Sequence, residues 1–112
     1  MAKQKESIFK EKVIKELKTL PNCWFVKVNQ RSGRGIPDIL LCLAGSFVAI
    51  ELKSSKKSLI APLQTWTLEE ISAKGGFSFI AFPENWLETF SALKELATRG
   101  NDDSEEDTKI IS

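Results

Sequence analysis

Residues 35–53 read GIPDILLCLAGSFVAIELK, two apolar runs on either side of a Gly-Ser pair. Runs of this length and composition, separated by two turn-forming residues, are typical of a β-hairpin. They predict strands over Asp38–Leu43 and Phe47–Lys53, closed by a type II′ turn at Gly45-Ser46. Alternation along the strands gathers six apolar side chains on one face, which predicts a core there and a hairpin in the middle of the sheet: Ile39, Leu41, Leu43, Val48, Ile50 and Leu52.

The charged residues of this stretch lie at one end of the predicted hairpin. Side chains alternate along a strand, so Glu51 and Lys53 share one face. The predicted pairing sets Asp38 opposite Lys53 and diagonal to Glu51 on that face. Two carboxylates and a lysine in a largely apolar sheet are costly to bury without a partner. A divalent cation is such a partner, because Mg²⁺ takes one or two carboxylates together with waters and a substrate phosphate.

The alternative is a surface hairpin on which Asp38 ends a strand and Glu51 and Lys53 form an ordinary solvated ion pair. Pro37-Asp38 alone, or Glu51-Leu52-Lys53 alone, favours that alternative. The two motifs together, at this spacing and in matching strands, favour a metal site. In such a site Lys53 would hold the attacking water or offset negative charge in the transition state.

Two predicted helices carry further polar side chains on their inner faces. Glu6 lies within about 20° of Val13, in the middle of the apolar stripe of the first helix. It is either a third metal-site carboxylate or a first-turn acid favoured by the helix dipole. Gln64 lies about 20° from Ile71 on the inner side of the second helix. It would hydrogen-bond a phosphate or a water held by the metal, or else a backbone group.

Hydrophobic periodicity and the Pro and Gly positions give the order helix, strand, strand, strand, helix, strand, helix. The fold class is therefore α/β or α+β, with one mixed β-sheet flanked by helices. We expect Trp24, Trp66 and Trp86 to pack in the core. Besides the hairpin, the predicted segments are a helix over Lys5–Leu20, a strand over Trp24–Asn29, a basic loop over Gln30–Ile36, a connector over Ser54–Ile60, a helix over Pro62–Ala73, a strand over Phe77–Phe82 and a helix over Pro83–Arg99.

The 112 residues are 42% hydrophobic and 28% charged, which is the composition of one soluble globular domain. We expect that domain over residues 1–99 and an acidic, disordered tail over residues 100–112. The absence of His and the presence of only two Cys exclude His-dependent catalysis and zinc knuckles. No phosphate-binding loop motif occurs, so no nucleotide cofactor is expected. No apolar run approaches the roughly 20 residues of a membrane span, which predicts a cytoplasmic protein with no membrane partner.

The net charge of +1 conceals two halves of opposite sign. Residues 1–60 contain twelve Lys and Arg against five acids, and residues 61–112 contain four against ten. The first half is the candidate polyanion-binding half. Arg31, Arg34, Lys56 and Lys57 lie in the basic segments that flank the hairpin, where they would contact a phosphate backbone without reading sequence. The alternative is that these segments are ordinary solvated loops.

The succession of Glu6, Ile36-Pro37-Asp38, Glu51-Leu52-Lys53 and Gln64 resembles the PD-(D/E)XK nuclease superfamily. The start at Gly35 and the helix beginning at Pro62 are similar to its VRR-NUC branch, in the stand-alone phage or bacterial form. The resemblance spans about residues 5–90. It implies a restriction-endonuclease-like core, dependence on Mg²⁺ or Mn²⁺, and phosphodiester hydrolysis leaving 5′-phosphate and 3′-hydroxyl ends.

The same resemblance implies roles for single residues. Asp38 and Glu51 would be metal ligands, Glu6 a further ligand directly or through water, and the carbonyl of Leu52 an additional candidate ligand. Lys53 would be the catalytic lysine and Gln64 a supporting polar group. Stand-alone members resemble homodimeric, structure-selective nucleases related to Holliday-junction resolvases, and a dimer would let two sites cut opposing strands.

Three functions therefore compete. The first is a metal-dependent DNA endonuclease that acts on branched DNA as a homodimer, and its nearest relative is a restriction or repair nuclease that cuts linear duplex. The second is a DNA-binding module that keeps the fold without catalysis, against which the intact Asp38, Glu51 and Lys53 speak. The third is a protein-interaction domain in which these residues form a structural ion network.

Overall fold

The computed structural model describes residues 5–28, 35–60 and 62–99. Three helices and four strands follow each other in the predicted order. Their bounds are α1 Lys5–Leu17, β1 Cys23–Lys27, β2 Ile39–Leu43, β3 Ser46–Leu52, α2 Pro62–Ala73, β4 Phe77–Ala81, a short 3-10 helix η2 Pro83–Asn85, and α3 Trp86–Arg99. The expected tail over residues 100–112 and the Arg31 and Arg34 loop lie outside the described residues.

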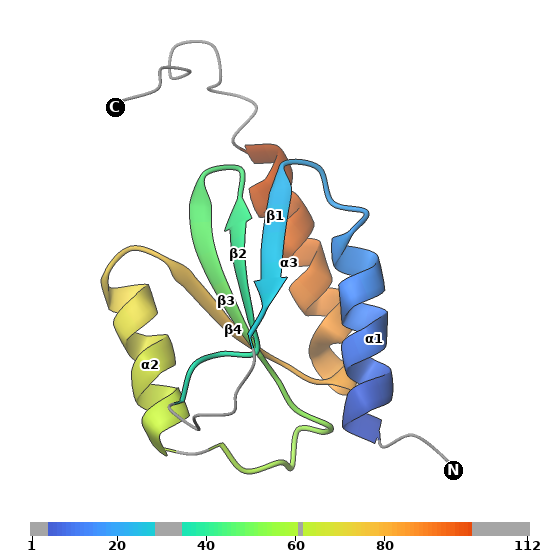
Figure 1. The fold of residues 1–112 in the computed structure, drawn as a ribbon, viewed down its shortest axis with the longest axis vertical. Helices are drawn as coiled ribbons and strands as arrows, with labels where there is room; N and C mark the ends of the chain where they lie inside the picture. The colour runs from blue at the N-terminus through green and yellow to red at the C-terminus, as the bar shows by residue number, and fades with distance from the viewer. Residues whose placement is uncertain (1–4, 29–34, 61, 100–112) are drawn as a thin grey trace.

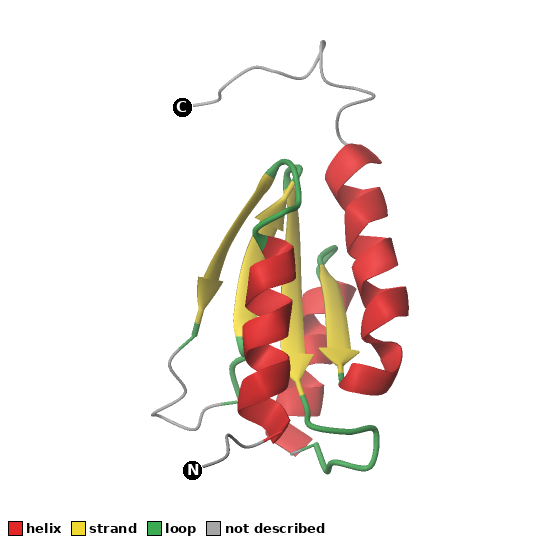
Figure 2. Cartoon of the chain, turned by 90° about the vertical axis from the view of Figure 1, so that its right-hand side faces the viewer, coloured by secondary structure: helices red, strands yellow, loops and turns green. Residues whose placement is uncertain are grey.

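The four strands form one mixed sheet in the order β1-β2-β3-β4. The pairs β1–β2 and β2–β3 are antiparallel, and β3–β4 is parallel because α2 carries the chain back to the end of the sheet at which β3 began. Helices α1 and α3 cover one face of the sheet and α2 covers the other (Figures 1 and 2). The mixed sheet flanked by helices confirms the predicted fold class, and β2 and β3 lie in its middle as predicted.

The hydrophobic core lies between the sheet and the helices α1 and α3. Strand alternation and the helix stripe bring Val13 and Leu17 of α1 against the predicted face of the hairpin, and Trp86 packs edge-on against Phe9. All six hairpin side chains expected in the core are at most 2% exposed. This core fixes which hairpin face remains for polar residues.

The hairpin turn differs from the predicted one. Ala44 and Gly45 are the two turn residues, both with positive φ (51° and 89°), and Leu43 pairs with Ser46. Positive φ at both positions defines a type I′ turn, whose twist suits the flanking strands. The predicted type II′ turn at Gly45-Ser46 was therefore wrong by one residue. The pairing moves by two residues, so every side chain keeps its predicted face.

Two of the three tryptophans lie outside the core, against prediction. Trp86 is 3% exposed, whereas Trp24 is 67% and Trp66 58% exposed. Trp24 points to the same sheet face as Cys42, its cross-strand partner, but α2 packs over β4 at the other side of that face. Trp66 lies on the ridge of α2 opposite the buried Leu68. An apolar half-sheet therefore stays uncovered beside α2.

The remaining helices begin and end close to prediction. Helix α2 matches its predicted range, while α1 ends at Leu17, followed by a turn in which the Leu20 amide donates to the Leu17 carbonyl. The last helix begins with the 3-10 turn η2, where the Asn85 side chain accepts from the Phe82 amide. Within the described residues, no helix has both the length and the apolar character to cross a bilayer.

Candidate metal and catalytic site

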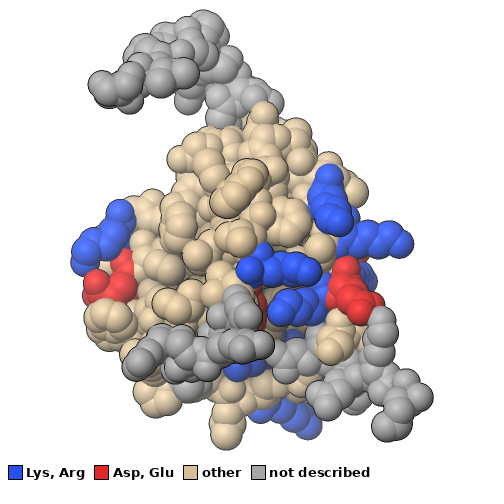
Figure 3. Space-filling model, viewed as in Figure 1, with Lys and Arg blue, Asp and Glu red and all other residues tan. Residues whose placement is uncertain are grey.

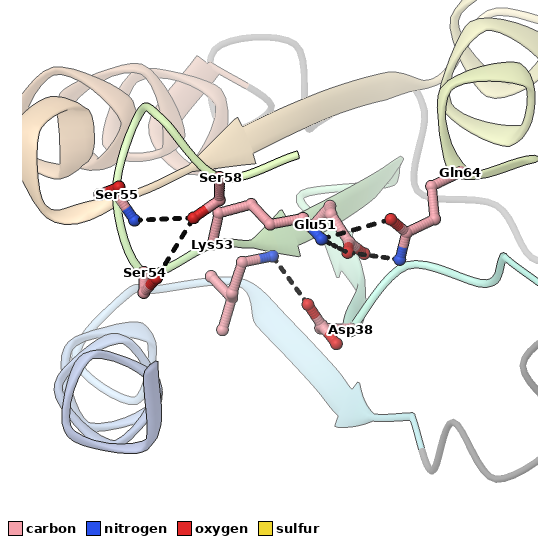
Figure 4. A network of polar contacts seen from close by, with 8 residues as sticks. Asp38, Glu51, Lys53, Ser54, Ser55, Ser58 and Gln64 are labelled. Carbon is pink, nitrogen blue, oxygen red and sulfur yellow. Dashed lines mark hydrogen bonds and ion pairs between the residues drawn. The ribbon is translucent and has the colours of Figure 1, made fainter. Parts of the chain in front are cut away.

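The site forms where β2 begins and β3 ends, because the hairpin brings these two strand ends together. Continuing the observed register by one residue sets Asp38 opposite Glu51, rather than opposite Lys53 as predicted. The Asp38 carboxylate accepts a hydrogen bond from the Leu52 amide, with 2.8 Å between Oδ2 and the nitrogen (Figure 4). This bond holds Asp38 against the end of β3.

Glu51 is the most deeply buried charged residue among the described ones, at 2% exposure. Its Oε2 accepts a hydrogen bond from Gln64 Nε2 at 2.6 Å and lies 3.4 Å from Lys53 Nζ. Lys53 Nζ in turn donates to Gln64 Oε1 at 3.4 Å. Figure 4 shows the three side chains converging from β3 and α2. The inward placement of Gln64, predicted from helix geometry, therefore brings it to Glu51 and Lys53.

The electrostatics of this cluster favour a proton on Glu51. Burial, and next the nearby Asp38 carboxylate, together raise the pKa of Glu51 from 4.5 to about 7, although Lys53 opposes the shift. Glu51 Oε1 is buried and has no hydrogen-bond partner within the described part of the chain. An unpartnered buried carboxylate oxygen is costly, so this atom calls for a cation or a proton.

The donors here fit a hard divalent cation. Mg²⁺ and Mn²⁺ prefer carboxylate and carbonyl oxygens, and Mg²⁺ is commonly held by only one or two carboxylates with waters completing the shell. Asp38 and Glu51 supply two carboxylates from adjacent strands. Among the described side chains, no group of three or more His, Cys, Asp or Glu could hold a metal. Glu6 belongs to the first turn of α1, but its side chain is outside the described part.

Lys56 and Lys57 are exposed in the loop that follows β3. Hydrogen bonds among the loop serines shape this segment: Ser54 Oγ lies 3.2 Å from Ser58 Oγ, and the Ser55 amide donates to Ser58 Oγ. The loop lies directly after Lys53, so its two lysines are connected to the site by a short, internally bonded segment. Their contact with nucleic acid stays a prediction.

Gly35 has a positioning role that the sequence interpretation did not assign. Its φ is +74°, and a Cβ added there would lie 2.7 Å from Leu63 Cγ. The close approach seats the first turn of α2 against the segment that leads into Asp38, which brings Gln64 to the site. In the sequence, the sign of this role was a glycine two residues before Pro37-Asp38, because glycine is favoured where the backbone adopts positive φ.

A mixed sheet with helices on both faces and a carboxylate pair beside a lysine at the central strand ends defines a restriction-endonuclease-like domain. A solved structure described as a "VRR_NUC domain protein" shares this fold with a TM-score of 0.67. The two chains are 16% identical over 86% of this chain and 93% of that one. The likeness establishes the fold. No family model matches the sequence, and no curated protein matches it.

Proposed function

We propose that the chain is a Mg²⁺- or Mn²⁺-dependent endodeoxyribonuclease that hydrolyses phosphodiester bonds. The observation that carries the proposal is the buried Glu51, whose Oε1 lacks a partner in the described structure while Asp38 lies opposite it, directly before β2. Its fold is shared with a protein described as a VRR_NUC domain protein, which supports the same conclusion.

In this proposal Asp38 and Glu51 hold the cation, Glu6 adds a ligand directly or through water, and the Leu52 carbonyl oxygen completes the protein ligands. When bound, the cation would polarise the scissile phosphate and lower the pKa of a nearby water. Lys53 positions the attacking water or offsets the charge that develops on the phosphate. Gln64 fixes both neighbours, since it donates to Glu51 and accepts from Lys53.

The substrate contacts follow from charge. Arg31, Arg34, Lys56 and Lys57 would bind the DNA backbone, because lysine and arginine in Ser- and Gly-containing loops suit phosphates and do not read bases. Binding should then depend strongly on salt and little on sequence.

We also propose a homodimer that acts on branched, Holliday-junction-like DNA, so that two sites cut opposing strands. The uncovered apolar half-sheet supports self-association, because Trp24, Val26 and Phe47 are exposed there. Linear duplex as the preferred substrate would instead assign the chain to restriction or repair-type nucleases.

The test is cleavage of labelled four-way junction, flap and linear duplex DNA with Mg²⁺, Mn²⁺ or EDTA. Wild type should cut with either metal and not in EDTA, and Asp38→Ala and Lys53→Ala should each lose at least about a hundredfold in rate. The exposed Glu88→Gln serves as control and should cut like wild type. DNA binding without cutting by the wild type would instead favour a non-catalytic binding module.

A further inference from the structure

A cavity lies away from the carboxylates, between α1 and the edge strand β1. It has a volume of about 630 Å³, and its charged lining is four lysines and one glutamate: Lys10, Lys15, Lys18, Lys27 and Glu11. Figure 3 shows basic side chains gathered on the side of the molecule that carries α1 and β1. We call this cavity the α1–β1 groove.

Helix geometry explains the lysine row. Lys10 lies on α1, and Lys18 directly follows its last residue, Leu17, where the Lys18 amide still donates to the Ile14 carbonyl at 3.2 Å. Their separation along the axis is about 12 Å, which corresponds to three or four phosphates of one strand of a duplex. Lys27, on β1, faces them from the opposite wall.

The described residues compensate little of the positive charge of the groove. None of the four lysines forms an ion pair with another described residue; the described ion pairs join Lys53 to Glu51 and Lys74 to Glu70. The other described acid of α1, Glu16, accepts a hydrogen bond from Trp86 Nε1 at 2.9 Å and so faces α3. Positive charges gathered in a concave surface make the local electrostatic potential more positive, which attracts anions.

The groove is joined to the candidate site through the backbone. Val28 lines the groove, and its amide donates to the carbonyl of Asp38 at 2.8 Å. Lys27, one residue earlier, pairs with Ile39 in the β1–β2 ladder. A strand of nucleic acid lying in the groove therefore reaches the end of the sheet that holds the two carboxylates.

We propose that the α1–β1 groove binds the phosphate backbone of the DNA substrate and guides it to the Asp38–Glu51 site. The inference rests on the proposed nuclease function and adds a contact surface separate from the loops after β1 and β3. The lining favours the phosphate backbone as its ligand, because the described lining contains lysines and no aromatic ring on which a base could stack.

The test measures binding of a labelled four-way junction and a linear duplex by fluorescence anisotropy in EDTA, where cleavage does not interfere. The groove variant is Lys18→Gln/Lys27→Gln, and the control of equal charge is Lys74→Gln/Lys94→Gln, directly after α2 and on α3. The groove variant should bind both DNAs roughly tenfold more weakly than wild type. Its plot of log affinity against log salt should be shallower, with a slope smaller in magnitude by about 2. The affinity and the salt slope of the control should change much less. Lys18→Arg/Lys27→Arg should retain wild-type affinity for DNA.

Wild-type affinity and salt slope in the groove variant would overturn the proposal. If metal-dependent cleavage by the wild type persisted in that case, the nuclease function would stand without the groove. A wild type that neither binds nor cuts DNA would overturn both. If the groove variant lost binding to anionic phospholipid vesicles while its DNA affinity stayed at the wild-type value, the groove would be assigned to a membrane surface. This result would also overturn the proposal.

Discussion

At the residue scale, Glu51 is the side chain on which the account depends. A carboxylate with one bonded oxygen and one oxygen without a described partner, buried beside a second carboxylate, destabilises the folded protein when it is ionised. Binding sites often retain groups that are unfavourable for stability because the ligand supplies the missing interaction. The pattern Glu-x-Lys predicted the cluster, but the sequence could not show that Asp38 lies opposite Glu51 rather than opposite Lys53, because that register depends on the turn.

The first prediction concerns the pH dependence of stability. The pKa of Glu51 is raised to about 7 in the folded protein against 4.5 ordinarily, so the folded state holds the proton more tightly than the unfolded one. The contribution of Glu51 to the free energy of unfolding is therefore most favourable below pH 4.5, falls as the pH rises to 7, and is constant above. The loss is roughly 1–3 kcal/mol.

Urea unfolding of the metal-free protein between pH 5 and 8 measures this loss. Glu51→Gln removes the titrating group and should flatten the decline, while Glu88→Gln should leave it as in wild type. An identical slope for wild type and Glu51→Gln would show that Glu51 does not titrate in this range.

The second prediction concerns Gln64, a positioning residue in this account. Gln64→Ala removes the amide that joins Glu51 to Lys53, so the turnover rate with Mg²⁺ should fall by about 10- to 100-fold while the affinity for DNA stays unchanged. Single-turnover cleavage and anisotropy separate the two quantities. An unchanged rate at saturating DNA would remove Gln64 from the catalytic machinery.

At the element scale, the hairpin shows what a sequence pattern determines. Its apolar alternation correctly predicted both faces and the central position, because the requirement to bury six side chains leaves one assignment. The turn type was not determined, since Ala44 gives no sign that it adopts positive φ. In the fold, Ala44 donates to the Asn22 carbonyl at 2.7 Å, a tertiary contact that a local pattern does not contain.

The third prediction follows from that turn. Alanine at φ 51° is strained, whereas Asn and Gly adopt this conformation readily in type I′ turns. Ala44→Asn should therefore raise the free energy of unfolding by about 0.5–1 kcal/mol. Ala92→Gly in α3 is the reference, because the same loss of alanine inside a helix should lower stability by about 1 kcal/mol. A destabilised Ala44→Asn would argue against the turn.

At the scale of the whole molecule, the arrangement of helices leaves one part of the sheet uncovered. Helix α2 packs over β4, and the β1–β2 half of that face exposes Trp24, Val26 and Cys42. The sequence interpretation placed Trp24 in the core, whereas Trp24 is 67% exposed in the fold. Coverage depends on where α2 crosses the sheet, which the periodicity of single elements does not determine.

The fourth prediction tests this surface as the dimer interface. Trp24→Ser should shift the protein from dimer toward monomer in sedimentation velocity at micromolar concentration, because it removes the largest exposed apolar side chain of the half-sheet. Leu87→Ser is the matched control, since Leu87 is 85% exposed on α3 and lies outside that surface. A wild type that sediments as a monomer would contradict the dimer.

Asp38 and Glu51 are proposed to form a divalent metal site. Titration of the protein with Mn²⁺, following the free ion by electron paramagnetic resonance at pH 8, measures this directly. We predict saturable binding by wild type and Glu88→Gln, and affinity at least about tenfold lower for Asp38→Asn and Glu51→Gln. Equal Mn²⁺ affinity in all four proteins would contradict the claim.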